Sequence, residues 1–98
     1  MPIVWLPVAV QDVIHIRTYI GEQAPESANM IGQRIDESIS RLSTMPNLGR
    51  PGRIYGTREL VISGTSYLVV YRVKDQRLEI LRVLHGRQPF SKSLKKII

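Results

Sequence analysis

Hydrophobic residues in the first half of the chain recur every three or four positions in two long segments. In residues 7–22 a single apolar stripe is formed by Ala9, Val13, Ile16 and Ile20. A second stripe begins after Pro25 and is formed by Ala28, Ile31, Ile35, Ile39, Leu42 and Met45. This spacing is typical of amphipathic helices that bury one face. Because Gly21 and residues 22–27 interrupt the pattern, the sequence predicts two helices that form an antiparallel hairpin.

The second half of the chain is rich in β-branched residues, and its apolar and polar residues alternate as they do in strands. Three strand-like runs cover residues 57–63, 67–73 and 78–85, and the connections "GTS" and "KDQR" suit antiparallel hairpins. In the last run, strict alternation places Leu78, Ile80, Arg82 and Leu84 on one face and Glu79, Leu81, Val83 and His85 on the other. The apolar run 3–6, "IVWL", predicts one more strand at the N-terminus.

These segments predict an α+β fold in a single domain, residues 1–98. The order is β-α-α-β-β-β, with the N-terminal helical hairpin packed on a mainly antiparallel sheet of about four strands. Residues 45–53, "MPNLGRPGR", predict a loop, and the basic tail 91–98 is either a frayed terminus or a short docking helix. The expected core residues are Ile16, Ile20, Ile31, Ile35, Leu42, Val69 and Leu81. Most of the aromatic residues Tyr55, Tyr67, Tyr71 and Phe90 should pack the sheet, which argues against a stacking platform for single strands.

Charge is distributed unevenly along the chain. The net charge is +6, but residues 1–49 carry three Lys and Arg against five Asp and Glu, whereas residues 50–98 carry eleven against three. An excess of positive charge on the half that is predicted to form the sheet favours an anionic partner, either nucleic acid or an acidic protein segment. The alternative is a solvated basic surface that only aids solubility.

Composition excludes several kinds of chemistry. The chain has no cysteine and two histidines, so neither a disulfide nor a metal site nor a cofactor is expected. No apolar run approaches ~18 residues, and the N-terminus lacks the features of a signal peptide. We therefore expect a cytoplasmic protein that does not enter a membrane. His15 lies off the first apolar stripe and is predicted to be an exposed surface histidine.

Three segments carry a resemblance to a known family. In their order and spacing, "LGRPGRIYGTREL", "YLVVYRV" and "LEILRVLHGRQ" resemble the RelE/ParE superfamily of type II toxin–antitoxin toxins, over residues 3–90. The resemblance implies a small toxin that is held inactive in a complex with a cognate antitoxin. It also implies one of two targets, which are DNA gyrase for ParE-like toxins and mRNA on the ribosome for RelE-like toxins.

The candidate site residues are cationic and come from the loop and the predicted sheet: Arg50, Arg53, Arg58, Arg82, His85 and Arg87. A metal-free ribonuclease needs groups that activate the 2′-hydroxyl, protonate the leaving oxygen and surround the phosphate with cations. RelE-like nucleases resemble one another in a basic constellation on the sheet, often with a Tyr or His near the C-terminus. The tail here offers Phe90, which cannot transfer a proton, so His85 is the only candidate acid or base at that end.

The residues favour the ParE-like alternative. Arg58 and Arg82 alternate with apolar neighbours, and arginines in such positions bury their stems and pair with carboxylates. We therefore expect them to bind an antitoxin or a target surface, and we expect His85 to be structural. The sequence predicts a toxin without chemistry of its own that inhibits DNA gyrase, and so DNA replication. Its partner would be an antitoxin with an acidic, partly disordered C-terminal segment, in a hetero-oligomer.

Two alternatives remain open. The first is a RelE-like, ribosome-dependent mRNA endonuclease that inhibits translation, with Arg58, Arg82, His85 and Arg87 at its site. The second is a non-toxic module that only binds nucleic acid or sequesters an antitoxin.

Overall fold

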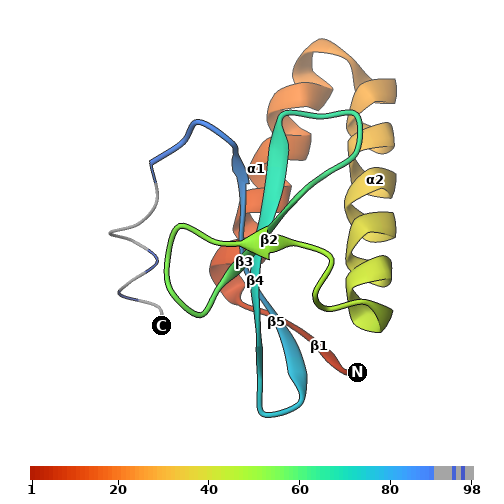
Figure 1. The fold of residues 1–98 in the computed structure, drawn as a ribbon. Coiled ribbons are helices and arrows are strands. Elements are labelled where there is room, and N and C mark those ends of the chain that lie inside the picture. Colours follow the sequence, from red (N-terminus) through yellow and green to blue (C-terminus); the bar gives the residue numbers. More distant parts are fainter. Residues whose placement is uncertain (90–93, 95, 97–98) are drawn as a thin grey trace.

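The computed structural model describes residues 1–89, 94 and 96, which form a helical hairpin packed against a sheet (Figure 1). The elements in chain order are β1 (Ile3–Trp5), α1 (Pro7–Gln23), α2 (Pro25–Thr44), β2 (Arg50–Pro51), β3 (Arg58–Val61), β4 (Tyr67–Lys74) and β5 (Arg77–His85). The predicted α+β fold is confirmed. Most of the tail prediction for residues 91–98 lies outside the described residues, as does Phe90.

Proline defines where each helix begins. Pro7 and Pro25 occupy first-turn positions of α1 and α2, where the missing N–H group would have no helical partner in any case. Only Ala24 separates the two helices, with an extended φ of −153°. Proline disfavours helical backbone in the residue before it, so α1 continues past Gly21 and ends just ahead of Pro25. The predicted hairpin is confirmed, with a shorter break than expected.

The sheet is five-stranded and mixed, in the order β1-β5-β4-β3-β2. β1 pairs with β5 in parallel, and all the other neighbours are antiparallel. The additional strand is β2, where Arg50 and Pro51 of the predicted loop pair with Glu59 and Arg58 of β3. An edge strand tolerates Pro51 because its outer side needs no ladder hydrogen bond.

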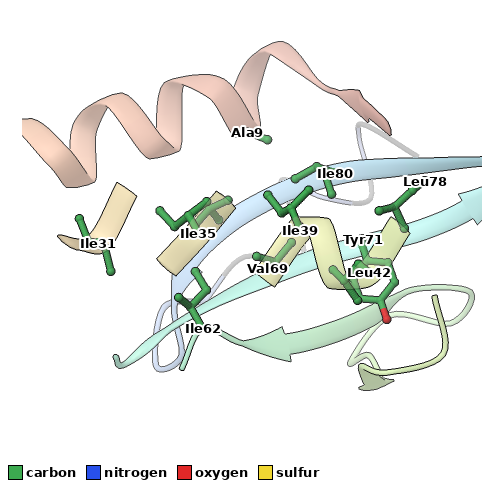
Figure 2. Close-up of a cluster of buried hydrophobic side chains, with 11 residues drawn as sticks. Ala9, Ile31, Ile35, Ile39, Leu42, Ile62, Val69, Tyr71, Leu78 and Ile80 are labelled. Carbon is green, nitrogen blue, oxygen red and sulfur yellow. The ribbon is translucent and has the colours of Figure 1, made fainter. Parts of the chain in front are cut away.

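Two apolar clusters cover opposite faces of the sheet. The main core lies between the sheet and the helices (Figure 2), and it contains Ala9, Ile31, Ile35, Ile39, Leu42, Ile62, Val69, Tyr71, Leu78, Ile80 and Val83. A second cluster is formed by Leu68, Val70, Leu81, Leu84 and Leu94, with Leu6 and Ile54 against it. Neighbouring residues of β4 alternate between the two clusters, which places the clusters on opposite sides of the strand.

A bulge in β5 changes the faces of its last residues. Val70 pairs with Arg82 and Tyr71 pairs with Ile80, so Leu81 is an extra residue in β5. One extra residue reverses the alternation that follows it. The grouping predicted from strict alternation holds through Leu81 and is wrong from Arg82 onward, as Val83 and Leu84 show, because a local pattern does not reveal where a bulge interrupts it.

Burial confirms most of the predicted core. Ile31, Ile35, Leu42, Val69 and Leu81 are buried, whereas Ile16 and Ile20 of α1 are half-buried against the main cluster. His15 is exposed as predicted. Among the aromatic residues, Tyr71 is buried and Tyr67 half-buried, but Tyr55 is fully exposed. Tyr55 lies in the turn before β3 and does not pack on the sheet.

No helix among the described residues is long and apolar enough to cross a membrane.

Candidate functional site

Gly49 is the point at which the loop before β2 is attached to the sheet. Its amide donates to the Tyr71 hydroxyl (2.9 Å), and that hydroxyl donates to the Pro46 carbonyl (2.7 Å). Arg58 donates to the Gly49 carbonyl (2.7 Å). A Cβ on residue 49 would lie 2.6 Å from the Tyr71 hydroxyl, which leaves room only for glycine. Burial raises the pKa of Tyr71, and the hydrogen bond from Gly49 and the charge of Arg58 oppose this.

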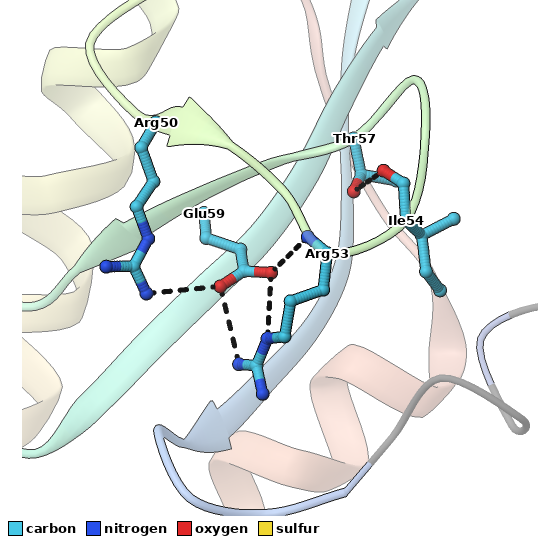
Figure 3. Close-up of polar contacts among 5 residues, drawn as sticks. All are labelled: Arg50, Arg53, Ile54, Thr57 and Glu59. Carbon is cyan, nitrogen blue, oxygen red and sulfur yellow. Dashed lines mark hydrogen bonds and ion pairs between the residues drawn. The ribbon is translucent and has the colours of Figure 1, made fainter.

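Glu59 joins two of the predicted site residues (Figure 3). The Arg53 backbone N–H donates to Oε2 (2.9 Å), and its guanidinium reaches both carboxylate oxygens (3.2 and 3.3 Å). Arg50 donates to Oε1 at 3.4 Å. The Glu59 side chain is 1% exposed, whereas those of Arg50 and Arg53 are 64% and 45% exposed. One buried carboxylate therefore holds two arginines at the protein surface.

These contacts also determine the protonation of Glu59. Burial raises its pKa, but the hydrogen bonds donated by Arg53 and Arg50, together with the charge of Arg53, outweigh burial. The pKa of Glu59 consequently lies below its ordinary value, and the carboxylate remains charged. The sequence analysis did not identify Glu59. The available signal was a carboxylate inside a predicted strand, directly before Leu60, Val61 and Ile62.

Arg82 is paired with Asp12 of α1. The guanidinium donates to both carboxylate oxygens (2.7 and 2.9 Å), and the backbone N–H of Val83 donates to Oδ2 (3.0 Å). The hydrogen bond to Asp12 raises the pKa of Arg82, with burial opposing it. Asp12 follows Ala9 by three residues and precedes Ile16 by four, so it lies at a stripe position of the helix. A carboxylate at such a position indicates a cationic partner within the fold. The sequence analysis did not identify Asp12.

A third carboxylate, Glu79, pairs with arginines at the other end of the β4–β5 ladder. Arg72 donates to Oε1 at 2.6 Å, and a guanidinium nitrogen of Arg77 lies 3.7 Å from Oε2. Three carboxylates thus neutralise much of the positive charge on the sheet. The arrangement binds arginines to the fold itself and leaves fewer of them to surround a phosphate.

The remaining predicted residues, His85 and Arg87, lie at the end of β5. The ladder pairs His85 with Tyr67, three pairs beyond the one between Val70 and Arg82. The His85 ring meets Tyr67 edge-on, with centroids 5.6 Å apart, and its Nδ1 accepts the Arg87 N–H at 3.3 Å. Both residues are exposed. In the described part of the chain, no hydrogen bond or ion pair connects His85 to a carboxylate.

The structure brings Arg50 and Arg53 together at one carboxylate, and His85 and Arg87 together at the end of β5, but it does not join the six predicted residues in one constellation. Arg50 and Arg53 meet at Glu59, Arg58 is bound to a carbonyl, and Arg82 is bound to Asp12. Within residues 1–89, 94 and 96, no group of three or more His, Asp and Glu side chains is placed to hold a metal ion. The geometry suits a binding surface, with exposed cations held in fixed positions.

The family model for the ParE toxin of the type II toxin–antitoxin system parDE matches residues 3–90. This chain belongs to the ParE toxin family. A chain of the chromosomal ParDE toxin–antitoxin system from P. aeruginosa superimposes with a TM-score of 0.79 at 27% identity, covering 87% of this chain and 95% of that one. The resemblance to the RelE/ParE superfamily is confirmed.

Two sequence relatives of this ParE-family toxin are also similar along most of their length. Y4kP of Sinorhizobium fredii, named as a candidate toxin, is 36% identical over 92% of this chain and 93% of its own. Toxin RelE2 of Caulobacter vibrioides is 32% identical over 86% of this chain and 93% of its own. Family membership makes this chain the toxin of a type II system, and such a system includes an antitoxin as the toxin's partner.

Proposed function

We propose that this ParE-family toxin inhibits DNA gyrase by binding to it and performs no chemistry of its own. The observation that carries the proposal is the internal pairing of its arginines. Arg50 and Arg53 are committed to Glu59, and Arg82 is committed to Asp12. A nuclease would need those cations around a scissile phosphate. A binding surface needs them only at fixed positions, where charge selects the partner.

The position of His85 supports the same proposal. A general acid or base has to reach the proton it transfers, and it is commonly oriented by a second group such as a carboxylate. His85 is turned toward the Arg87 backbone N–H and lies three pairs along the ladder from the Arg82 position. The match to the ParE family model and the likeness to a ParDE system also favour gyrase. The toxin would act in the cytoplasm, where it would block DNA replication.

The antitoxin of this toxin would have an acidic, partly disordered segment that orders on binding. Residues 50–98 carry eleven Lys and Arg against three Asp and Glu, and all three of those carboxylates have an arginine within ion-pair distance. The remaining cations leave a net positive surface, which speeds encounter with an acidic segment. This partner accounts for both the charge asymmetry and the exposed cations.

A second candidate function is ribosome-dependent mRNA cleavage, which the similarity to Toxin RelE2 favours. One experiment separates the two. Purified toxin is added to gyrase with ATP and plasmid and, in parallel, to translating ribosomes. We expect plasmid supercoiling to be blocked, or the plasmid to become linear, with mRNA left intact. Cuts at codon positions in mRNA, with normal supercoiling, would replace the proposal with the nuclease function.

A further inference from the structure

A hollow of about 450 Å³ lies between the N-terminal half of α2 and the β3–β4 connection. Figure 1 shows that connection beside the upper part of α2. The floor is apolar and is formed by Ile20, Met30, Ile31 and Tyr67. The lining also includes Arg34 and His85 and the hydroxyl residues Ser27, Thr65 and Ser66, and no carboxylate is among the lining residues.

Arg34 is fixed in position by the β3–β4 connection. Its Nη1 donates to the Ser63 carbonyl at 3.0 Å. Gly64 has a φ of +75°, and a Cβ there would lie 2.9 Å from Nη1, so glycine allows the guanidinium to lie against the turn. Within the described residues Arg34 has no carboxylate partner, in contrast to Arg50, Arg53 and Arg82. Its remaining N–H groups are therefore available to an incoming anion.

His85 also lines this hollow. Its Nδ1 accepts the Arg87 backbone N–H, so in the neutral ring the proton is assigned to Nε2. The edge-on contact with Tyr67 holds the ring plane. An Nε2–H group and a guanidinium at one hollow match the two oxygens of a carboxylate.

We propose that this hollow receives an acidic side chain, with an apolar neighbour, from the cognate antitoxin. The carboxylate binds Arg34 and His85, and the apolar neighbour packs on Ile31 and Tyr67. The inference rests on the proposed acidic segment of the antitoxin, and it names where that segment docks. The larger hollow between α1 and α2, about 730 Å³, includes Asp36 as well as Arg17. Its mixed charge suits an acidic segment less well.

The first test measures antitoxin affinity with charge-matched variants. Arg34→Gln and Met30→Glu are compared with Arg17→Gln, which removes the same charge from the other hollow. Met30 is 53% exposed, so Met30→Glu adds a repelling charge without emptying the core. We expect Arg34→Gln and Met30→Glu each to weaken binding of the purified antitoxin by about tenfold or more, and Arg17→Gln to change it by less than about threefold. Thermal unfolding of each variant establishes that it is folded.

The second test asks whether the contact is direct. Acidic residues of the antitoxin segment are replaced one at a time by their amides, and each variant is titrated with wild-type toxin and with Arg34→Gln. If a carboxylate binds Arg34, one amide variant should lose affinity for wild-type toxin but show almost no further loss with Arg34→Gln. Additive losses at every acidic position would overturn the proposal, as would wild-type affinity in folded Arg34→Gln and Met30→Glu.

The absence of cysteine from the chain allows a third measurement. Met30→Cys introduces one thiol on α2 and Met45→Cys one thiol just past its C-terminal end, at positions that are 53% and 50% exposed in the parent. Bound antitoxin should slow alkylation of Met30→Cys by about tenfold and leave Met45→Cys nearly unchanged. Equal protection at both positions, or none at position 30, would place the segment elsewhere.

These outcomes are separable from the gyrase proposal. Free Arg34→Gln should inhibit gyrase as the wild type does, but it should resist neutralisation by antitoxin. Wild-type toxin that binds antitoxin and spares gyrase would overturn only the target. Variants that bind antitoxin normally while wild-type toxin blocks gyrase would overturn only the docking site.

Discussion

Arg82 and Asp12 lie 70 positions apart in the sequence and are joined by two side-chain hydrogen bonds of 2.7 and 2.9 Å. The pair connects the last strand to the first helix, and both side chains are mostly buried. Arg82 is opposite Val70 at the bulge of β5. Arg82, one of the arginines predicted to bind a partner, instead holds the fold together, so recognition of a partner is left to the exposed cations.

Removing the carboxylate of this pair should destabilise the fold. Asp12→Ala leaves the guanidinium and the Val83 N–H without their acceptor, so we expect the free energy of unfolding to fall by about 3 kcal/mol. Urea unfolding measures the change, and Asp36→Ala, at an exposed position on α2, is the control. With Arg82→Met added, the double variant should lose less than the sum of the single changes. A loss below about 0.5 kcal/mol would mean that the pair contributes little.

Glu59 should make stability depend on acid pH. The pKa of Glu59 in the folded state lies below its ordinary value, so its stabilising contribution is complete above the unfolded-state pKa and is lost as pH falls through the folded-state pKa. Denaturant unfolding of wild type should therefore show a decline between about pH 5 and pH 3 that is shallower in Glu59→Gln. Glu37→Gln, an exposed change on α2, should keep the wild-type slope. Parallel curves for wild type and Glu59→Gln would contradict the prediction.

Substitutions at Gly49 and Tyr71 should have strongly non-additive effects on the free energy of unfolding. Gly49→Ala forces a Cβ against the Tyr71 hydroxyl, and Tyr71→Phe removes the partner of the Gly49 N–H and the Pro46 carbonyl. We expect Tyr71→Phe to lower the free energy of unfolding by about 2 kcal/mol. In the double variant the missing hydroxyl makes room for the methyl group, so the total loss should fall short of the sum. Strict additivity, measured by chemical denaturation, would mean that the loop moves away instead.

The β4–β5 turn offers a stabilising change. Asp75 and Gln76 both have positive φ, 53° and 61°, as in the hairpin turns that favour glycine at the second position. Gln76→Gly should raise the free energy of unfolding by about 1 kcal/mol, because glycine has no Cβ to clash in that backbone conformation. Gln76→Ala, which keeps the Cβ, should bring no such gain in thermal unfolding.

Substitutions at and just after the end of β5 can distinguish a gyrase-binding surface from a catalytic site. If this surface docks on gyrase, Arg87→Glu should weaken gyrase inhibition by about tenfold, because it places a repelling charge in the contact. Arg41→Glu, which makes the same charge change at an exposed position on α2, is the control. Arg82 is unsuitable for this test, since reversing its charge would also break the pair with Asp12.

The complementary variant at this end is His85→Gln, which keeps a donor but removes an acid or base. Its effect on gyrase inhibition should be small. General acid–base catalysis contributes about 10²–10⁴-fold, so a nuclease would lose its toxicity with this change. Loss of toxicity in a folded His85→Gln variant that still binds antitoxin would support the nuclease function.

Local sequence patterns predicted the helices and strands well because these elements are specified by residues that lie close together in the sequence. The stripe that includes Ile31, Ile35 and Leu42 repeats every three or four residues, which is the distance over which a helix brings side chains together. Pro25 breaks the helical run through its own backbone chemistry. These features depend on a few consecutive residues, so the sequence by itself determined the hairpin, the strands and the basic character of the second half.

Only the tertiary structure decided what the arginines do. The bulge at Leu81 reverses the faces of the last strand, and it leaves no mark in the alternation of a nearly continuous apolar run. The partner of Arg82 is 70 residues away, and a charge pair forms wherever folding brings two side chains within a few ångströms. Sequence spacing carries no information about that distance. That Arg82 is tied to the fold and is not free to meet a partner therefore follows from the packing of α1 on β5.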